Sequence, residues 1–477
     1  MTRTKLILSI LITLICAVCI RIPFFEVPMI SDEGGYAYVA HFWSDQYMPY
    51  RDMPFDRPQG IFLLYRIALA FGEDIGAIRM FAAAWNALTA VAIMLCIGAV
   101  FPLRRVFGAS LLGGLLYAVF STAPRIEGFT ANAEIFTLLP LTVAALFTWR
   151  RQWLWAGLAA GVATAIKPTG VAGLLLALSW LLVTRVPRRA ALSLLAGYAI
   201  APGLCLIHGA LLDWPAYWAS FVDRRLLLYS AASTGIGEQL GMLVQGVKDT
   251  ASAWLFLALA TAYTALKQRN RTAAFLGLWV VSSWCGMAMG GLWHWHYFQQ
   301  LIPPLAVGAG GCLVAYDMRQ NNRLVNMIWA VALVGALALF IRSDMPFWFQ
   351  QPKDISTNLY HRGAYLVSDD VGRLVRKYTR PDERIYVAFA EAEVYFSSQR
   401  KAAVPQLFYR DIEFSEELFN EVITSLNDGV PAIVIKSHNP PPAFMSKDQF
   451  IALLQRRYEL AGRAGPLQIW VRQEPTR

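Results

Sequence analysis

The sequence predicts an all-α membrane domain that crosses a bilayer many times, followed by a small C-terminal α/β domain. Hydrophobic residues make up 56% of the 477 positions and charged residues only 16%, whereas a soluble protein of this size carries about 25% charged residues. Apolar stretches of about 17 residues or more recur along the first two thirds of the chain, and each is long enough for a membrane-spanning helix.

The character of the sequence changes near Ser343. Beyond this point charged residues return at ordinary density, and no window is long and apolar enough to span a bilayer. We therefore predict a membrane domain over 1–342 and an outer domain over 343–477. Strands alternating with helices indicate that the outer domain is α/β. The strands are expected at 384–389, 432–435 and 468–471, and the helices at about 362–378, 414–427 and 447–458.

The charge and cysteine patterns narrow the class further. The net charge of +10 lies mostly in short loops between apolar runs, which favours membrane topology over nucleic-acid binding. All six cysteines fall in apolar segments, so no disulfide framework or metal-ligand spacing is indicated. The N-terminus resembles a signal peptide, but Ile20-Arg21-Ile22-Pro23 is a poor cleavage site, and we expect an uncleaved first span.

Clusters of cations set the sidedness of the predicted spans, because cytoplasmic loops carry an excess of Lys and Arg. If all clusters are cytoplasmic, the chain has about eleven membrane segments, with the N-terminus inside and the C-terminal domain outside. The clusters are Arg3/Lys5, Arg104/Arg105, Arg150/Arg151, Arg185/Arg188/Arg189, Lys267/Arg269/Arg271 and Arg319/Arg323. The full-length runs lie at about 6–24, 78–101, 107–122, 133–149, 190–209, 251–266, 272–289, 298–315 and 324–342.

The interval between Arg151 and Arg185 fits this scheme only with two short or re-entrant helices. It is too long for one span and too short for two spans of about 20 residues each. Lys167-Pro168 lies in its middle, so we expect the chain to turn there. Irregular backbone at membrane depth survives only beside protein or a wet cavity. Lys167 is therefore predicted to point into a cavity near the outer side.

With this topology, charged and polar residues converge in the outer loops, and the first of these loops spans about 25–77. Charged groups at membrane depth are costly and suggest function. Carboxylates can take a proton from a hydroxyl nucleophile, and cations can stabilise a phosphate leaving group. A substrate with its phosphate at the bilayer surface would use both. The candidates are Asp32, Glu33, Arg57, Glu127, Glu134, Lys167, Arg224, Arg225, His294, His296 and Tyr297.

Each candidate also has a structural interpretation. Asp32 and Arg57 suit a solvated polar loop, and Glu134 suits a helix N-terminus, where the dipole favours acids. Lys167 can snorkel to the headgroups. Arg224 and Arg225 can be lipid-facing anchors. His294 and His296 at i, i+2 can form part of an interfacial aromatic belt; a metal site is the alternative, but no carboxylate or cysteine lies nearby in sequence.

Several short motifs follow one another along the chain. The first loop contains Asp32-Glu33-Gly34-Gly35-Tyr36, Tyr50-Arg51-Asp52 and Arg57-Pro58-Gln59-Gly60. Three further motifs follow: Ala131-Asn132-Ala133-Glu134 with Leu138-Leu139-Pro140, then Ala165-Ile166-Lys167-Pro168, and then His296-Tyr297-Phe298-Gln299-Gln300-Leu301-Ile302-Pro303. Over about the first 315 residues this pattern resembles GT-C glycosyltransferases, in the bacterial branch related to protein O-mannosyltransferases and to the aminoarabinose transferases that modify lipid A.

The resemblance implies an inverting transferase that uses a polyprenyl-phosphate sugar on the outer face of the bacterial cytoplasmic (inner) membrane. Asp32 would be the general base, with Glu33 supporting it or binding the acceptor. Arg57, which stands where many relatives have Lys before Pro-Pro, would contact the donor phosphate. The resemblance also implies that Lys167, with Tyr297 or Gln300, lines the donor site. Further predicted substrate-binding residues are Tyr36, Glu134, Arg224, Arg225 and His296. Relatives do not require a metal for the chemistry, so no cofactor is predicted, although a divalent metal stays possible.

Two other functions stay open at this stage. A transporter or flippase of lipid-linked sugars would use the same cations but needs inverted repeats and broken helices in both halves, and the sequence shows one interrupted segment. A lipid-binding scaffold would leave Asp32 and Lys167 dispensable. The expected partners are a polyprenyl-phosphate sugar, an acceptor that is a glycan, a lipid or a protein, and membrane lipids, with no nucleic acid.

Overall fold

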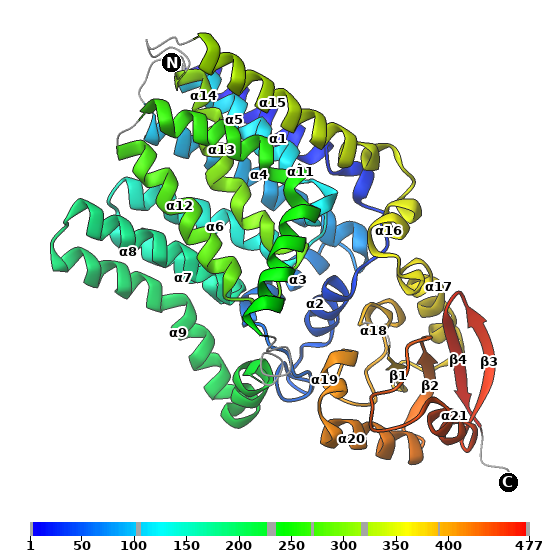
Figure 1. Ribbon diagram of the computed structural model, residues 1–477. Helices are drawn as coiled ribbons and strands as arrows, with labels where there is room; N and C mark the ends of the chain where they lie inside the picture. The colour runs from blue at the N-terminus through cyan, green and yellow to red at the C-terminus, as the bar shows by residue number, and fades with distance from the viewer. Residues whose placement is uncertain are drawn as a thin grey trace.

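The computed structural model describes residues 3–101, 106–226, 235–268, 271–315, 323–389 and 392–473. A body of long helices carries a smaller C-terminal part with a four-stranded sheet at one end (Figure 1). The N-terminus lies at the far end of the helical body, and the C-terminus lies beyond the sheet.

A helix covers every apolar run that the sequence indicates. They are α1 (Arg3–Cys19), α4 (Ile75–Val100), α5 (Val106–Phe120), α6 (Ala133–Trp149), α7 (Trp153–Ile166), α8 (Ala172–Thr184), α9 (Arg188–Trp218), α11 (Ile236–Gln268), α12 (Arg271–Ala288), α13 (Ile302–Gly310) with the 3₁₀ turn Trp295–Leu301 before it and α14 (Cys312–Ala315) after it, and α15 (Arg323–Ser343). Among the described residues, five helices are long and apolar enough to cross a membrane. The number of segments that cross stays a prediction. Arg104, Arg105, Arg269 and Arg319 lie outside the described residues.

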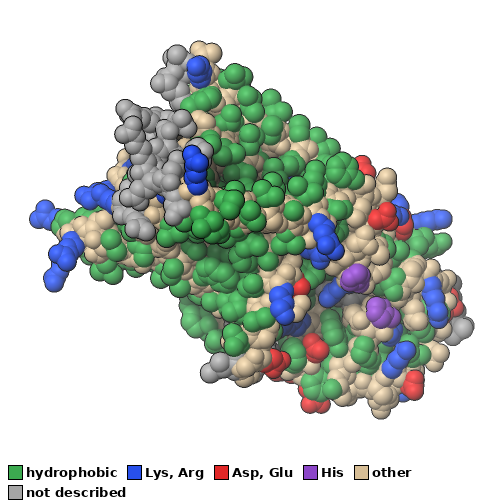
Figure 2. All heavy atoms as spheres, turned by 45° about the horizontal axis from the view of Figure 1, so that its top comes forward, with side chains coloured by type: hydrophobic (Ala, Val, Ile, Leu, Met, Phe, Trp, Pro, Cys, Tyr) green, Lys and Arg blue, Asp and Glu red, His purple; other side chains and the backbone are tan. Residues whose placement is uncertain are grey.

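The outer surface of the helical body is apolar. Hydrophobic side chains cover most of it in Figure 2, whereas charged side chains gather at its end and over the C-terminal part. Leu182 on α8 and Leu211 on α9 are 79% and 80% exposed. A large continuous apolar surface is rare on soluble monomers, and here it suits contact with lipid.

The turn predicted at Lys167-Pro168 is confirmed. Helix α7 ends at Ile166, Lys167 has extended backbone, and a 3₁₀ turn over Pro168–Val171 leads into α8. Small residues bring the hairpin close to its neighbours: a Cβ atom on Gly157 would lie 2.0 Å from the carbonyl oxygen of Leu194 on α9. The packing therefore fixes the position of the turn.

The first outer loop is more ordered than the sequence indicates. The segment read as a polar loop holds two helices, α2 (Ser31–Phe42) and α3 (Gln59–Leu69). The prediction of a polar loop around Asp32 is therefore wrong. Gly34-Gly35 in the first turns of α2 is unfavourable for a helix. The close packing there nevertheless requires a residue without a side chain, because a Cβ atom on Gly34 would lie 2.3 Å from the Cα atom of Glu393.

The C-terminal part is α/β, as predicted. Its sheet has the order β1-β2-β4-β3, in which β1 (Arg384–Ala388) is parallel to β2 (Pro431–Lys436) and the β3–β4 hairpin (Tyr458–Ala464 and Leu467–Arg472) is antiparallel. Its helices are α16 (Pro352–Tyr360), α17 (Gly363–Tyr378), α18 (Glu393–Ser398), α19 (Tyr409–Glu413), α20 (Glu416–Asn427) and α21 (Lys447–Gln455). Strand β3 was not predicted, and the helix predicted over 447–458 overlaps Tyr458, the first residue of β3.

The C-terminal part packs directly on the first outer segment. The backbone N–H of Ala402 donates to the Tyr38 hydroxyl at 2.8 Å, and the hydroxyls of Ser31 and Tyr365 lie 3.0 Å apart. The α2 helix thus lies between the helical body and the C-terminal part. The domain boundary near 342 stays a prediction, although α15 ends at Ser343.

Candidate active site

A cavity of about 640 Å³ lies between the helical body and the C-terminal part. This volume is in the range of small-molecule sites, about 300–1,000 Å³. Nine of the candidates named from the sequence line it: Asp32, Arg57, Glu127, Lys167, Arg224, Arg225, His294, His296 and Tyr297. They come from segments far apart in sequence, and the fold brings them together.

Asp32 is a carboxylate of this cavity that is open to a substrate. It is the second residue of α2, where the helix dipole favours an acid. Its side chain is half-buried, and among the described residues no hydrogen bond or ion pair engages its carboxylate. The charge of Asp32 interacts with those of Arg57 and Lys167, so an acid and two cations share one chamber.

Glu33 points the other way, into the protein. Its carboxylate is fully buried and pairs with Arg79 of α4, with Nη2 to Oε2 at 2.8 Å and Nε to Oε1 at 3.1 Å. It also accepts from the backbone N–H groups of Ala131, at 2.8 Å, and Ile30, at 3.2 Å. Glu33 therefore anchors the start of α2. Of its two expected roles, acceptor binding does not fit this enclosed position, whereas support of Asp32 does.

Arg57 presents its guanidinium to the cavity from the loop before α3. Its Nη1 lies 2.5 Å from Oδ2 of Asp56, and Nη2 of Arg225 lies 3.3 Å from the same oxygen. Burial alone would raise the pKa of Asp56, but Arg57, Arg225 and Arg224 together hold this pKa below its usual range. Asp56 is thus a fixed anion that orients Arg57 without neutralising the combined positive charge.

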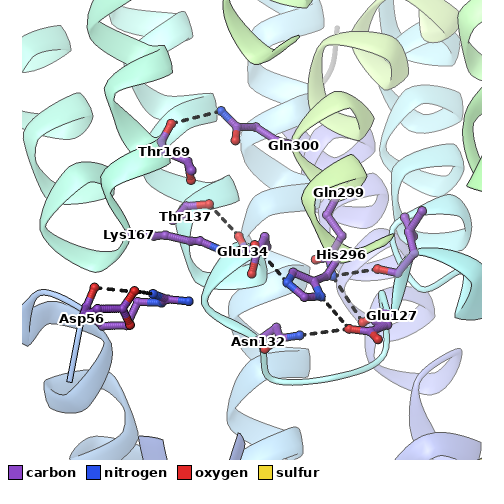
Figure 3. Close-up of polar contacts among 12 residues, drawn as sticks. Asp56, Glu127, Asn132, Glu134, Thr137, Lys167, Thr169, His296, Gln299 and Gln300 are labelled. Carbon is purple, nitrogen blue, oxygen red and sulfur yellow. Dashed lines mark hydrogen bonds and ion pairs between the residues drawn. The ribbon is translucent and has the colours of Figure 1, made fainter. Parts of the chain in front are cut away.

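Lys167 belongs to a buried chain of charged groups (Figure 3). Its ammonium pairs with Glu134 and lies 4.4 Å from the centroid of the Tyr297 ring. The imidazole of His296 continues the chain, with Nε2 3.7 Å from Oε1 of Glu134 and Nδ1 2.8 Å from Oε2 of Glu127. Glu134 does not line the cavity and acts behind Lys167, holding its ammonium at the wall.

Arg224 and Arg225 follow the π-helical turn Ala219–Asp223 after α9 and bind protein groups. Arg224 pairs with Asp411 of α19 and donates to the carbonyl oxygen of Pro54, while Arg225 contacts Asp56. Their side chains are 13% and 21% exposed. The interpretation as lipid-facing anchors is therefore wrong, and Arg224 instead joins the first outer segment to the C-terminal part.

Tyr36 and Gln300, also expected to bind substrate, do not line the cavity. Tyr36 is buried, and its ring centroid lies 5.5 Å from that of Tyr65. The side-chain amide of Gln300 donates to the carbonyl oxygen of Thr169 at 3.3 Å and braces the turn after Lys167. Both residues shape the wall of the cavity from behind.

Sequence reasoning missed part of the lining. Asp56 was not among the candidates, although it stands next to Arg57 and was a detectable partner. The larger omission is the wall from the C-terminal part, where the sequence carried no signal. Its members are Tyr360, Arg362, Tyr365, Phe408, Tyr409, Arg410, Asp411 and Glu413.

The histidine pair shows an aromatic arrangement. The rings of His294 and His296 are stacked with centroids 5.5 Å apart, and Tyr297 packs edge-on against both. Within the described residues, no group of three or more His, Cys, Asp or Glu side chains is placed to hold a metal ion. The expectation that the chemistry needs no metal stays a prediction.

Comparison with known proteins identifies solved structures of the same fold. No family model and no curated protein sequence matches the chain. Among solved structures, ArnT from Cupriavidus metallidurans bound to undecaprenyl phosphate is similar at 14% identity, covering 98% of each chain, with a TM-score of 0.64. The oligosaccharyltransferase of Archaeoglobus fulgidus is similar at 12% identity over 91% of this chain and 70% of its own, with a TM-score of 0.54. Both are GT-C glycosyltransferases, so the predicted GT-C fold is confirmed.

Proposed function

We propose that this protein is an integral membrane glycosyltransferase. It transfers a sugar from a polyprenyl-phosphate donor to an acceptor hydroxyl at the outer face of a bacterial cytoplasmic membrane. The observation that carries the proposal is one cavity in which the carboxylate of Asp32 faces the cations Arg57 and Lys167. The GT-C fold and the undecaprenyl phosphate in the similar ArnT structure support it.

Asp32 takes the acceptor proton in this mechanism. An acceptor hydroxyl that hydrogen-bonds to the carboxylate becomes a better nucleophile as its proton moves to Asp32. Because no hydrogen bond or ion pair within the described part of the chain occupies this carboxylate, it is available as a base. Glu33 and Arg79 hold the helix that carries it, so that the base is preorganised.

Arg57 and Lys167 stabilise the leaving group. As the acceptor oxygen attacks the anomeric carbon, the bond from that carbon to the phosphate oxygen breaks, and negative charge grows on the polyprenyl phosphate. Fixed cations in a site that excludes bulk water stabilise such charge strongly. The phosphate leaves as an anion, and no general acid is needed.

The direct displacement inverts the configuration at the anomeric carbon. It needs one base and no enzyme nucleophile, which agrees with the carboxylate of Asp32 facing the two cations. The sugar is a hexose or a pentose, and the acceptor is a cell-envelope glycan, a lipid or a protein. We also propose that the N-terminus is cytoplasmic, that the C-terminal domain lies outside, and that no metal cofactor takes part.

Transfer is tested against transport with purified protein in liposomes. Undecaprenyl-phosphate sugars are added in one leaflet together with an extract of cell-envelope acceptors. Mass spectrometry then measures new glycosylated products, and leaflet-specific enzymatic digestion of the donor measures its translocation. We expect sugar transfer with free undecaprenyl phosphate as the second product. Translocation of intact donor without transfer would instead establish a flippase.

A further inference from the structure

We propose that Arg410 of the C-terminal domain binds an anionic group, a phosphate or carboxylate, on the acceptor. The inference rests on the proposed transferase function and names the chemistry of its second substrate. Arg410 lies on α19, which contributes to the cavity wall opposite the helical body. Nothing in the sequence motifs points to this residue.

Arg410 differs in its pairing from four other cations of the cavity, Arg57, Lys167, Arg224 and Arg225. Arg57 and Arg225 share Asp56, Arg224 binds Asp411, and Lys167 binds Glu134; these four pairs are at ion-pair distance. Arg410 is half-buried, and within the described residues no carboxylate lies within ion-pair distance of it. A guanidinium without a carboxylate partner can form charge-assisted hydrogen bonds to a bound anion.

The protein fixes the position of Arg410. The next residue, Asp411, pairs with Arg224 of the helical body and accepts from the backbone N–H of Phe408. The ring of Phe408 packs edge-on against Phe55, with centroids 5.3 Å apart. Tyr409 packs against Phe389 at 5.7 Å. Contacts on both sides therefore hold α19 against the first outer segment, and Arg410 faces the cavity from a rigid element.

The placement separates Arg410 from the donor phosphate site. Arg57 and Lys167 belong to the helical body, where the polyprenyl chain must remain in lipid, whereas Arg410 approaches from the C-terminal domain. The positive charge of Arg410 is one of the groups that disfavour protonation of His294, which lines the same cavity. An acceptor that enters between the two parts would thus place its hydroxyl near Asp32 and an anionic substituent near Arg410.

The experiment uses the purified full chain in nanodiscs, loaded with undecaprenyl phosphate to fill the donor site. Inorganic phosphate is the probe, and its binding is followed by ³¹P NMR line broadening. The variants are Arg410→Gln, the charge-conserving Arg410→Lys, and Arg57→Gln. The matched control is Arg463→Gln, which changes an exposed arginine of β3 in the same domain.

We expect the loaded wild-type protein to bind phosphate and Arg410→Gln to weaken that binding at least tenfold. Arg410→Lys should retain most of the binding, and Arg463→Gln should retain all of it. Arg57→Gln should weaken binding of undecaprenyl phosphate, whereas Arg410→Gln should not. No phosphate binding by the loaded protein would overturn the inference, as would a loss of undecaprenyl phosphate binding in Arg410→Gln equal to that in Arg57→Gln.

The product formed in cells gives an independent readout. Mass spectrometry of glycolipids and glycoproteins from cells with and without the chain identifies the acceptor, which should carry a phosphate or carboxylate. A neutral acceptor would refute the role of Arg410 while leaving the transferase intact. Absence of any sugar transfer by the wild-type protein would instead refute the proposed function itself.

Discussion

Glu33 and Arg79 form an enclosed ion pair immediately behind Asp32, with Oε2 and Nη2 2.8 Å apart and both side chains at 0% exposure. Arg79 also donates to the carbonyl oxygens of Phe24 and Val27, at 2.7 and 2.6 Å. One guanidinium therefore joins the end of the first helical segment, the start of α2 and α4. Adjacent acids in the sequence thus have opposite tasks: Asp32 faces the cavity and Glu33 holds the scaffold.

Breaking this pair from one side should destabilise the fold. Glu33→Gln leaves the charge of Arg79 buried without its partner, and such changes typically cost about 3–5 kcal/mol. The double variant Glu33→Gln/Arg79→Met removes both charges and should regain part of that loss. Thermal unfolding in detergent, followed by tryptophan fluorescence, measures both. If Glu33→Gln unfolds at the wild-type temperature, the anchoring role assigned to Glu33 is wrong.

The sequence analysis placed Asp32 correctly on the cavity but misjudged its neighbours for a physical reason. Sidedness follows from loop charges, so the convergence of Asp32, Arg57 and Lys167 was predictable. The side chains of Asp32 and Glu33 point in different directions because both residues belong to the helix α2. In that helix Gly34 packs against Glu393, a residue more than 350 positions away in the chain.

Dependence on tertiary contacts also explains why β3 and the cavity wall in the C-terminal part were not predicted. The central strands β1 and β2 are largely buried and apolar, and such runs are readable in sequence. The edge strand β3 is mostly exposed and contains no β-branched residue, so its pattern does not reveal a strand. Its pairing with β4 through a turn at Gly465, where φ is +53°, is a tertiary property. The cavity wall around Arg410 was hidden likewise, because neither charge periodicity nor a motif marks it.

Lys167 should be required for donor binding independently of its structural pairing. Lys167→Met removes the cation and leaves Glu134 buried without its partner, so we expect both weaker binding of undecaprenyl phosphate and lower stability. In Lys167→Met/Glu134→Gln the buried charge is gone, and stability should recover while binding does not. Lys248→Met, at an exposed lysine, serves as the control.

The measurement for Lys167 is the dissociation constant of undecaprenyl phosphate in nanodiscs, set beside the unfolding temperature. We expect at least a tenfold rise in the constant for both the single and the double variant. Wild-type affinity in the stable double variant would show that Lys167 serves the fold alone.

Asp56 should stabilise the fold over most of the accessible pH range. Its pKa in the folded protein lies below its usual range, because Arg57, Arg225 and Arg224 outweigh the effect of burial. A depressed carboxyl pKa contributes stability at pH values above the unfolded pKa of about 3.9, and this contribution is lost as the pH falls through the folded value. Wild type should therefore exceed Asp56→Asn in unfolding temperature by a constant margin from pH 8 to pH 5.

That margin should narrow only in stronger acid, below about pH 4. Unfolding temperatures of both proteins across a pH series give the comparison, with Asp45→Asn as the control because Asp45 is exposed. A margin that already shrinks between pH 7 and pH 5 would contradict the electrostatic account of Asp56.

The central claim is that Asp32 is the base that activates the acceptor, and turnover by Asp32→Asn tests it most directly. Purified wild type and variant are each given the undecaprenyl-phosphate sugar and the acceptor identified in cells. We expect kcat to fall by about 10²–10⁴-fold, with the unfolding temperature and undecaprenyl phosphate binding unchanged. Asp45→Asn should keep the wild-type rate. Turnover by Asp32→Asn at the wild-type rate would contradict the mechanism.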